Sequence, residues 1–167
     1  MPQNATPTSG PDLRIRPATA ADRTRLIPLI NAAFAVETFL EGTRTDEARL
    51  AVMMQKGTIL AAEDNFGQLL GCIYMEVRGM RGYLGQLAVD PAHQRYGLAK
   101  RLMAAAEEHL RRQGCEAVEI TVLSLRTELP PIYRRYGYVE IGAEDFHTTQ
   151  PLKSGAECHC IVMVKQL

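Results

Sequence analysis

The chain has 167 residues, which is enough for one domain with a sizeable core. Nineteen basic and nineteen acidic residues give a formal net charge of zero, and no run rich in lysine and arginine occurs. These features argue against nucleic acid as a partner. No apolar stretch is long enough to span a membrane, and the first residues lack the apolar core of a signal peptide. We therefore expect a cytoplasmic protein without a membrane partner.

Residues 1–11 are polar and rich in proline, a composition typical of disorder. The rest of the chain contains no internal repeat and no linker rich in glycine or serine. We predict a disordered tail over residues 1–11 and a single domain over residues 12–167.

The first part of the domain alternates between strand and helix patterns. A short strand at Leu13–Arg16 precedes a helix that Thr19 and Asp22 cap, and Pro28 is expected to kink that helix or delay its start. The later predictions are a helix that begins after Thr45-Asp46 and ends near Gln55, and a hairpin of strands Thr58–Glu63 and Gln68–Arg78 around the turn 64–67.

The central stretch comprises a strand, a turn and a long helix. Tyr83–Val89 is apolar on both faces apart from Gln86, as expected of an interior strand, and Asp90-Pro91 ends it. A helical period begins near Arg95, with a leucine or alanine at every fourth position on one face. The opposite face is expected to carry two ion pairs at helical spacing, namely Glu107–Arg111 and Glu108–Arg112.

The turn before this helix has the features of a phosphate site. Backbone N–H groups at the start of a helix have no intrahelical partner, and the helix dipole is positive there. Small residues at Gly97 and Ala99 would let a phosphate approach the backbone closely.

After the helix, Glu116–Leu123 has the composition of another interior strand. The remaining predictions are a short helix at Glu128–Tyr136, strands at Tyr138–Ile141 and Cys158–Lys165, and a loop or hairpin at Gly142–Gly155. A strand, helix and strand in succession imply a right-handed parallel crossover, whereas the hairpins imply antiparallel pairs. The predicted fold is α/β (α+β), with a mixed, twisted sheet of about seven strands flanked by about four helices.

The four cysteines do not indicate a metal centre. Cys72 and Cys115 lie in patterns typical of small buried residues. In a strand, Cys158 and Cys160 share one face while His159 points to the other, which suits a single ion badly. We expect no metal.

Two motifs resemble the GNAT superfamily of acyl-CoA-dependent N-acyltransferases. Gln94-Arg95-Tyr96-Gly97-Leu98-Ala99, between a buried strand and an amphipathic helix, resembles the family's Gln/Arg-x-x-Gly-x-Gly/Ala loop, which binds the pyrophosphate of coenzyme A. Ile132-Tyr133-Arg134-Arg135-Tyr136-Gly137-Tyr138 resembles the family's Leu-Tyr-x-x-x-Gly-Phe segment. The order of elements agrees with the GNAT fold from Leu13 onward.

The resemblance implies roles for particular residues. The backbone of Leu87, Ala88 and Val89 would bind the pantetheine arm, and one N–H of this strand could stabilise the oxyanion. Tyr133 matches the tyrosine that acts as general acid in many members, although it could instead be an aromatic residue that packs on the sheet. The residues implied to hold the pyrophosphate are Gln94, Arg95, Tyr96, Gly97, Leu98, Ala99 and Lys100.

The sequence departs from the family pattern in two places. Members with a glutamate base often carry it on the fourth strand, where this chain has none. A water chain, Glu37 or Glu41 could act as the base here, and the two glutamates would also suit binding of a cationic amine. Arg126 replaces the family's asparagine seven residues before the motif tyrosine. It could contact coenzyme A, contact an acidic group of the substrate, or form ion pairs at a helix start.

The resemblance therefore implies an N-acetyltransferase that moves an acetyl group from acetyl-CoA, its co-substrate, to a primary amine of a small molecule or a peptide. The alternative is a non-catalytic acyl-CoA-binding or regulatory module. The sequence is compatible with a homodimer.

Overall fold

The computed structural model describes residues 12–167, and the predicted tail lies outside the described residues. Seven strands form one sheet in the order β1-β2-β3-β4-β5-β7-β6. The strands are β1 (Arg14–Pro17), β2 (Thr58–Glu63), β3 (Leu69–Arg78), β4 (Arg81–Val89), β5 (Ala117–Leu123), β6 (Val139–Asp145) and β7 (His159–Gln166). The helices are α1 (Arg23–Phe34), α2 (Glu47–Lys56), α3 (Leu98–Arg112) and α4 (Leu129–Arg135), with 3-10 turns η1 (Ala20–Asp22) and η2 (Pro91–His93).

The sheet is mixed, as the sequence predicts. β1 to β4 pair antiparallel with their neighbours, and so do β5, β7 and β6. β4 and β5 pair in parallel, because α3 carries the chain from one end of the sheet back to the other. β1 and β6 form the two edges, and all seven residues of β6 are exposed. The predicted fold class and order of elements are confirmed.

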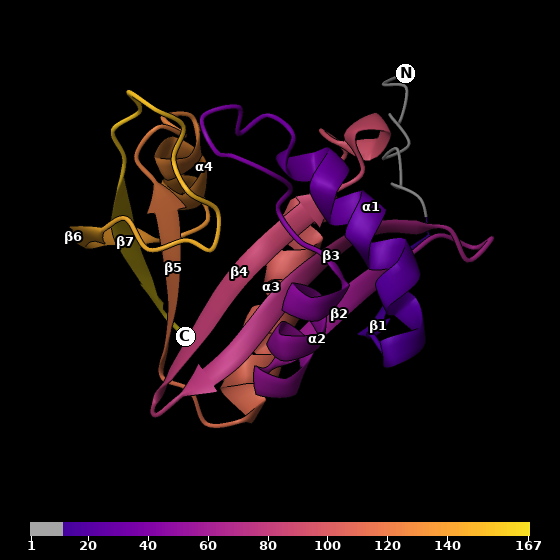
Figure 1. Ribbon diagram of the computed structural model, residues 1–167. Coiled ribbons are helices and arrows are strands. Elements are labelled where there is room, and N and C mark those ends of the chain that lie inside the picture. Colours follow the sequence, from indigo (N-terminus) through magenta and orange to yellow (C-terminus); the bar gives the residue numbers. More distant parts are fainter. Residues whose placement is uncertain (1–11) are drawn as a thin grey trace, which may run out of the picture.

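Helices cover both faces of the sheet (Figure 1). Successive residues of a strand point to opposite faces, so that β2 sends Leu60 and Ala62 into the core beneath α3 and Ile59 and Ala61 into the core beneath α1 and α2. The apolar face of α3 packs on the first of these cores through Leu98, Leu102, Met103, Ala106 and Leu110. A sheet buried on both faces explains why the central strands are apolar on both sides.

The structure corrects two details of the central helix. α3 begins at Leu98 rather than near Arg95, because Arg95 and Gly97 have φ values of 72° and 78°, in the left-handed region that ends a helical path. Glu107 is buried, so the predicted Glu107–Arg111 pair is wrong. Its carboxylate accepts from the Tyr138 hydroxyl at 2.8 Å and pairs with Lys165 at 2.8 Å. Arg111 pairs instead with Glu108.

Two other boundaries differ from the predictions. α1 begins at Arg23, after the 3-10 turn η1, and runs through Pro28 without a break. β6 continues to Asp145 rather than ending at Ile141, since Gly142–Asp145 pairs with residues 159–162 of β7. Among residues 12–167, no helix combines the length and the apolar character that crossing a bilayer requires.

A charged network fixes α1 to the β1 edge of the sheet. Asp22, whose side chain is only 6% exposed, pairs with Arg16 at 2.8 Å and with Arg25 at 2.7 Å. It also accepts a hydrogen bond from the Thr19 N–H at 2.7 Å. Chiefly because of Arg16, the pKa of the Asp22 carboxyl lies well below its usual range.

A lowered carboxyl pKa contributes stability that is present above the pKa of the unfolded state and lost as the pH falls toward that of the folded state. We expect Asp22→Asn to lower the free energy of unfolding at pH 7 by about 1–3 kcal/mol, as expected for lost hydrogen bonds to charged groups. The difference from the wild type should shrink below a pH of about 4. Chemical denaturation at several pH values measures it. Glu116→Gln, at an exposed carboxylate, is the control, and a pH-independent Asp22→Asn effect would contradict the electrostatic explanation.

Candidate active site

The site lies where β4 and β5 separate. Their parallel pairing covers only Arg81–Leu84 of β4 and Ala117–Ile120 of β5, although both strands continue beyond it. Figure 1 shows the two strands diverging toward the end of the sheet that carries α4. The side of β4 that faces β5 therefore has no ladder partner after Leu84. Backbone groups along this edge are available to a ligand that adds like a strand.

A β-bulge shapes β4 at the same level. Cys72 of β3 lies opposite Ala88, and Tyr74 lies opposite Gly85, so β4 contains one more residue than β3 between these pairs. Gln86 within the bulge has a φ of 50°, unusual for a residue other than glycine. Its side chain is buried and accepts a hydrogen bond from Arg44 Nε at 2.8 Å.

Two cavities meet at this bulge. The α3 cavity, of about 730 Å³, lies among β4, β5, the start of α3 and α4. The α2 cavity, of about 770 Å³, lies among α2, β3, β4, β5 and the segment that joins β6 to β7. The residues that line both are Arg44, Tyr83, Gly85, Gln86, Thr121 and Leu123. Two reactants that enter from different sides could therefore meet beside Gln86.

The loop before α3 forms one end of the α3 cavity. The amides of residues 95–100 make no hydrogen bond to other groups of residues 12–167, and they lie at the positive end of the α3 dipole. A Cβ added at Gly97 would meet no atom within 4 Å, so the space before the loop is open. Gln94 Nε2 donates to the Val89 carbonyl at 3.1 Å and ties the loop to the end of β4.

His93 also lines the α3 cavity. Its Nδ1 is the buried side-chain polar atom that has no hydrogen-bond partner within residues 12–167. It lies 3.8 Å from an oxygen of Asp90. Among residues 12–167 as a whole, no group of three or more histidine, cysteine, aspartate or glutamate side chains could hold a metal ion.

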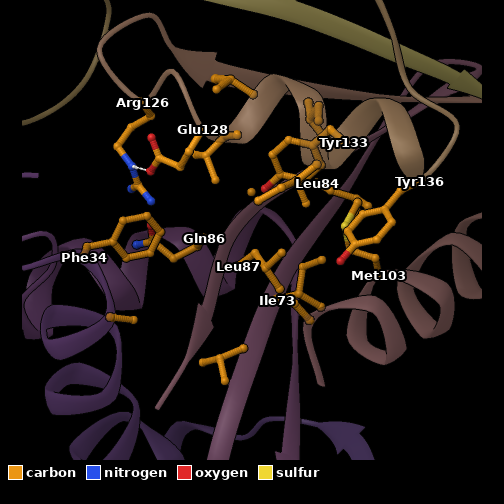
Figure 2. Close-up of a pocket in the computed structure, with 18 of the residues that line it drawn as sticks. Phe34, Ile73, Leu84, Gln86, Leu87, Met103, Arg126, Glu128, Tyr133 and Tyr136 are labelled. Atoms are coloured by element: carbon orange, nitrogen blue, oxygen red, sulfur yellow. Dashed lines mark hydrogen bonds and ion pairs between the residues drawn. The ribbon is translucent and has the colours of Figure 1, made fainter. Parts of the chain in front are cut away.

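Tyr133 lies on α4 above the unpaired part of β4. Figure 2 shows its ring among the side chains that line the α3 cavity. The ring packs edge-on against Tyr136 and Tyr138, but its hydroxyl has no partner within residues 12–167. Burial raises the pKa of Tyr133 to about 12. The hydroxyl is therefore protonated at neutral pH and can donate a proton in the cavity.

A buried cluster of charges closes the other end of the α3 cavity. Glu37, in the segment after α1, pairs with Arg126 at 2.9 Å and with Arg44 at 3.2 Å. Arg126 also pairs with Glu128 at 2.6 Å, the contact drawn in Figure 2. Arg44 stacks over Phe34, and burial lowers the pKa of its guanidinium. Glu37 thus ties two segments together, because Arg44 lies seven positions away in the same loop whereas Arg126 lies 89 positions away.

The structure brings most of the sequence-predicted site residues to one cavity. Those that line the α3 cavity are Glu37, Leu87, Val89, Gln94, Arg95, Gly97, Leu98, Ala99, Arg126 and Tyr133. Four others line neither cavity: the Ala88 side chain packs beneath α1, and Tyr96, Lys100 and Glu41 are exposed.

Sequence reasoning missed Arg44 and Tyr83 in the wall that the two cavities share. Gln86, also in that wall, carried a signal, because it is the polar residue in an otherwise apolar strand. Arg44 carried none, since its contact to Gln86 spans 42 positions.

Comparisons with known proteins agree on one family. A family model described as an acetyltransferase (GNAT) domain matches residues 29–149. Ribosomal-protein-alanine N-acetyltransferase from Brucella melitensis superposes with a TM-score of 0.74 at 20% identity, over 92% of this chain and 99% of that chain. IAA acetyltransferase from Bacillus cereus gives 0.72 at 17% identity, over 93% and 100%. The structure of yncA from Salmonella typhimurium, solved with its cofactor acetyl-CoA, gives 0.71 at 20% identity, over 93% and 94%. These structures share the fold, and the family model covers most of the sequence: the chain belongs to the GNAT acetyltransferase family.

Proposed function

We propose that this acetyltransferase moves the acetyl group of acetyl-CoA to a primary amine of a small molecule or a peptide by direct attack on the thioester. The observation that carries the proposal is the pair of cavities that share a wall at the β4 bulge. One cavity contains a phosphate-binding type of loop, and the other leaves room for an acceptor. The neighbour solved with acetyl-CoA supports this co-substrate. The names of the other neighbours indicate acceptors of more than one class.

The residues of the α3 cavity fit coenzyme A. The free amides of residues 95–100 would hold the pyrophosphate, because they combine unpaired N–H donors with the helix dipole. The backbone of Leu87–Val89 would bind the pantetheine arm along the edge that β5 leaves unpaired. This edge leads from the phosphate loop back to Gln86, so the thioester would reach the wall that the two cavities share.

The chemistry requires an amine nitrogen to form a bond to the thioester carbon while the carbon–sulfur bond breaks. A backbone N–H near the bulge would stabilise the oxyanion. The protonated Tyr133 hydroxyl would give its proton to the leaving thiolate, and the amine would release a proton to water. Family membership and the free Tyr133 hydroxyl favour this enzyme over the non-catalytic acyl-CoA-binding module.

The charged cluster fits a positioning role. Glu37 is occupied by two arginines, so it is a poor partner for a cationic amine, and Glu41 is exposed outside both cavities. Of the three roles considered for Arg126, its pairs with Glu37 and Glu128 favour the ion-paired one. We propose that Glu37 and Arg126 fix the position of Arg44.

Coenzyme A should raise the melting temperature of the wild type, since it binds only the folded protein. Gly97→Glu should abolish this shift by placing a carboxylate where the pyrophosphate would lie. Any residue other than glycine is strained at this φ of 78°, so Gly97→Ala is the matched control: it carries the strain without the charge and should retain most of the shift. Thermal denaturation with and without coenzyme A measures all three. A full shift in a folded Gly97→Glu variant would show that the phosphate lies elsewhere.

Tyr133→Phe keeps the ring and its edge-on contacts and removes only the hydroxyl. A thiolate is a fairly good leaving group, so the general acid should help without being indispensable. We expect kcat to fall by roughly 10- to 1000-fold, with the affinity for acetyl-CoA little changed. Steady-state kinetics and melting curves on Tyr133→Phe and Tyr133→Ala distinguish catalysis from packing. If the phenylalanine variant turned over like the wild type under conditions where chemistry limits the rate, Tyr133 would have no part in the mechanism.

A further inference from the structure

If the function proposed above is correct, the acceptor amine approaches through the α2 cavity. The α3 cavity contains the phosphate loop, and the α2 cavity meets it only along their common wall. The charges that line the α2 cavity therefore bear on the chemical class of the acceptor.

Of the three carboxylates that line this cavity, Glu76 and Glu119 are paired with arginines. Glu76 accepts from the Tyr74 hydroxyl at 2.6 Å and pairs with Arg78 at 3.0 Å. Glu119 pairs with Arg81 at 3.2 Å. Glu144 lies 3.8 Å from His147 Nε2 at the exposed rim. A cationic amine would have to compete with these partners, so the cavity is poorly suited to a polyamine.

The cations that line this cavity are Arg44, Arg49, Lys56 and Arg78. Arg49 is paired with Asp46 and Arg78 with Glu76, and the charge of Lys56 acts on Glu76 as well. Arg44 is therefore the lining cation best placed to bind an anionic group.

Arg44 is the cation closest to the reacting centre. Its Nε donates to Gln86 and its Nη1 to Glu37, whereas its Nη2 has no partner within residues 12–167. The side chain is 23% exposed and lines both cavities. Glu37 is shared between Arg44 and Arg126, and Glu128 also pairs with Arg126, so two carboxylates face two arginines and the half-buried Arg44 is held by Glu37 through Nη1 alone. A bound anion would give Nη2 a charged hydrogen-bond partner.

We infer that the acceptor is a small amine with an acidic group beside the amine, as in a free amino acid, and that Arg44 Nη2 binds this acidic group. The separation follows from geometry. Arg44 Nε lies 2.8 Å from the side chain of Gln86, the residue in the bulge where the amine would meet the thioester. An acid a few bonds from the amine can therefore reach Arg44 while the amine attacks. In a peptide the α-carboxyl group of the first residue is consumed in the peptide bond, so a peptide N-terminus offers such an acid only when its first side chain is acidic.

The test compares matched acceptors with acetyl-CoA: free L-amino acids, their α-carboxamides, and a polyamine such as spermidine. Acetylated products are identified by mass spectrometry, and kcat/KM is measured for each matched pair. We expect kcat/KM to be about 10- to 100-fold higher for each acid than for its carboxamide, which is the range of a hydrogen-bonded ion pair. Arg44→Gln should reduce that ratio to within about threefold. Arg49→Gln is the matched control, because Arg49 lines the same cavity but is bound to Asp46 and to the Thr43 carbonyl. It should keep the ratio.

A second readout does not depend on turnover. Calorimetry measures binding of N-acetyl amino acids and their amides to the protein saturated with coenzyme A, in the wild type and in both variants. Selective, Arg44-dependent binding of the acids without acetylation of any amine would support the anion site and reject the proposed function. Equal use of acids and carboxamides, a preference for spermidine, or an unchanged ratio in Arg44→Gln would overturn the inference while leaving acetyl transfer intact. If Arg44→Gln does not fold, Arg44→Lys is the substitute. It keeps the charge but loses the planar pair of N–H donors of the guanidinium, so it should give an intermediate acid-to-carboxamide ratio.

Discussion

The structure depends on a single interruption of hydrogen bonding. β4 and β5 pair in parallel for four residues and then separate, although both strands continue. Buried backbone N–H and C=O groups need partners, so an unpaired stretch in the middle of a sheet is costly unless water or a ligand satisfies it. The α3 helix makes this arrangement stable, because its apolar face holds β2, β3 and β4 together from one side. The site is thus the place where the sheet is left incomplete.

Ion pairs organise the part of the site around Glu37, Arg44 and Arg126. Burying a carboxylate is costly without partners. Glu37 obtains one partner, Arg44, from its own loop and the other, Arg126, from the segment before α4. In return, the arginines are held at fixed positions beside the bulge. The same contact that neutralises Glu37 therefore sets the direction of Arg44, and a loop that the sequence shows as irregular becomes a rigid wall between two cavities.

The sequence was informative wherever a local rule decides the structure. Alternation and helical periodicity found the strands and helices, and Gly97 and its neighbours identified the phosphate type of loop from a motif a few residues long. It was uninformative where the partner is distant. Glu107 has helical spacing to Arg111, but Lys165, 58 positions away, lies against it in the fold. The contact of Glu37 with Arg126, 89 positions away, and the bulge at Gln86 depend in the same way on which segments become neighbours, and no local pattern reports that.

The exposed edge strand β6 bears on how copies of this chain can meet. Unpaired strand edges invite pairing with another chain, and natural sheets often prevent it with charge. If two β6 strands paired antiparallel about Gly142, Glu140 would face Glu144 of the other copy, and Val139 would face Asp145. Two pairs of like charges directly opposite one another are destabilising. The acidic residues of β6 therefore oppose a continuous sheet across two molecules in this register.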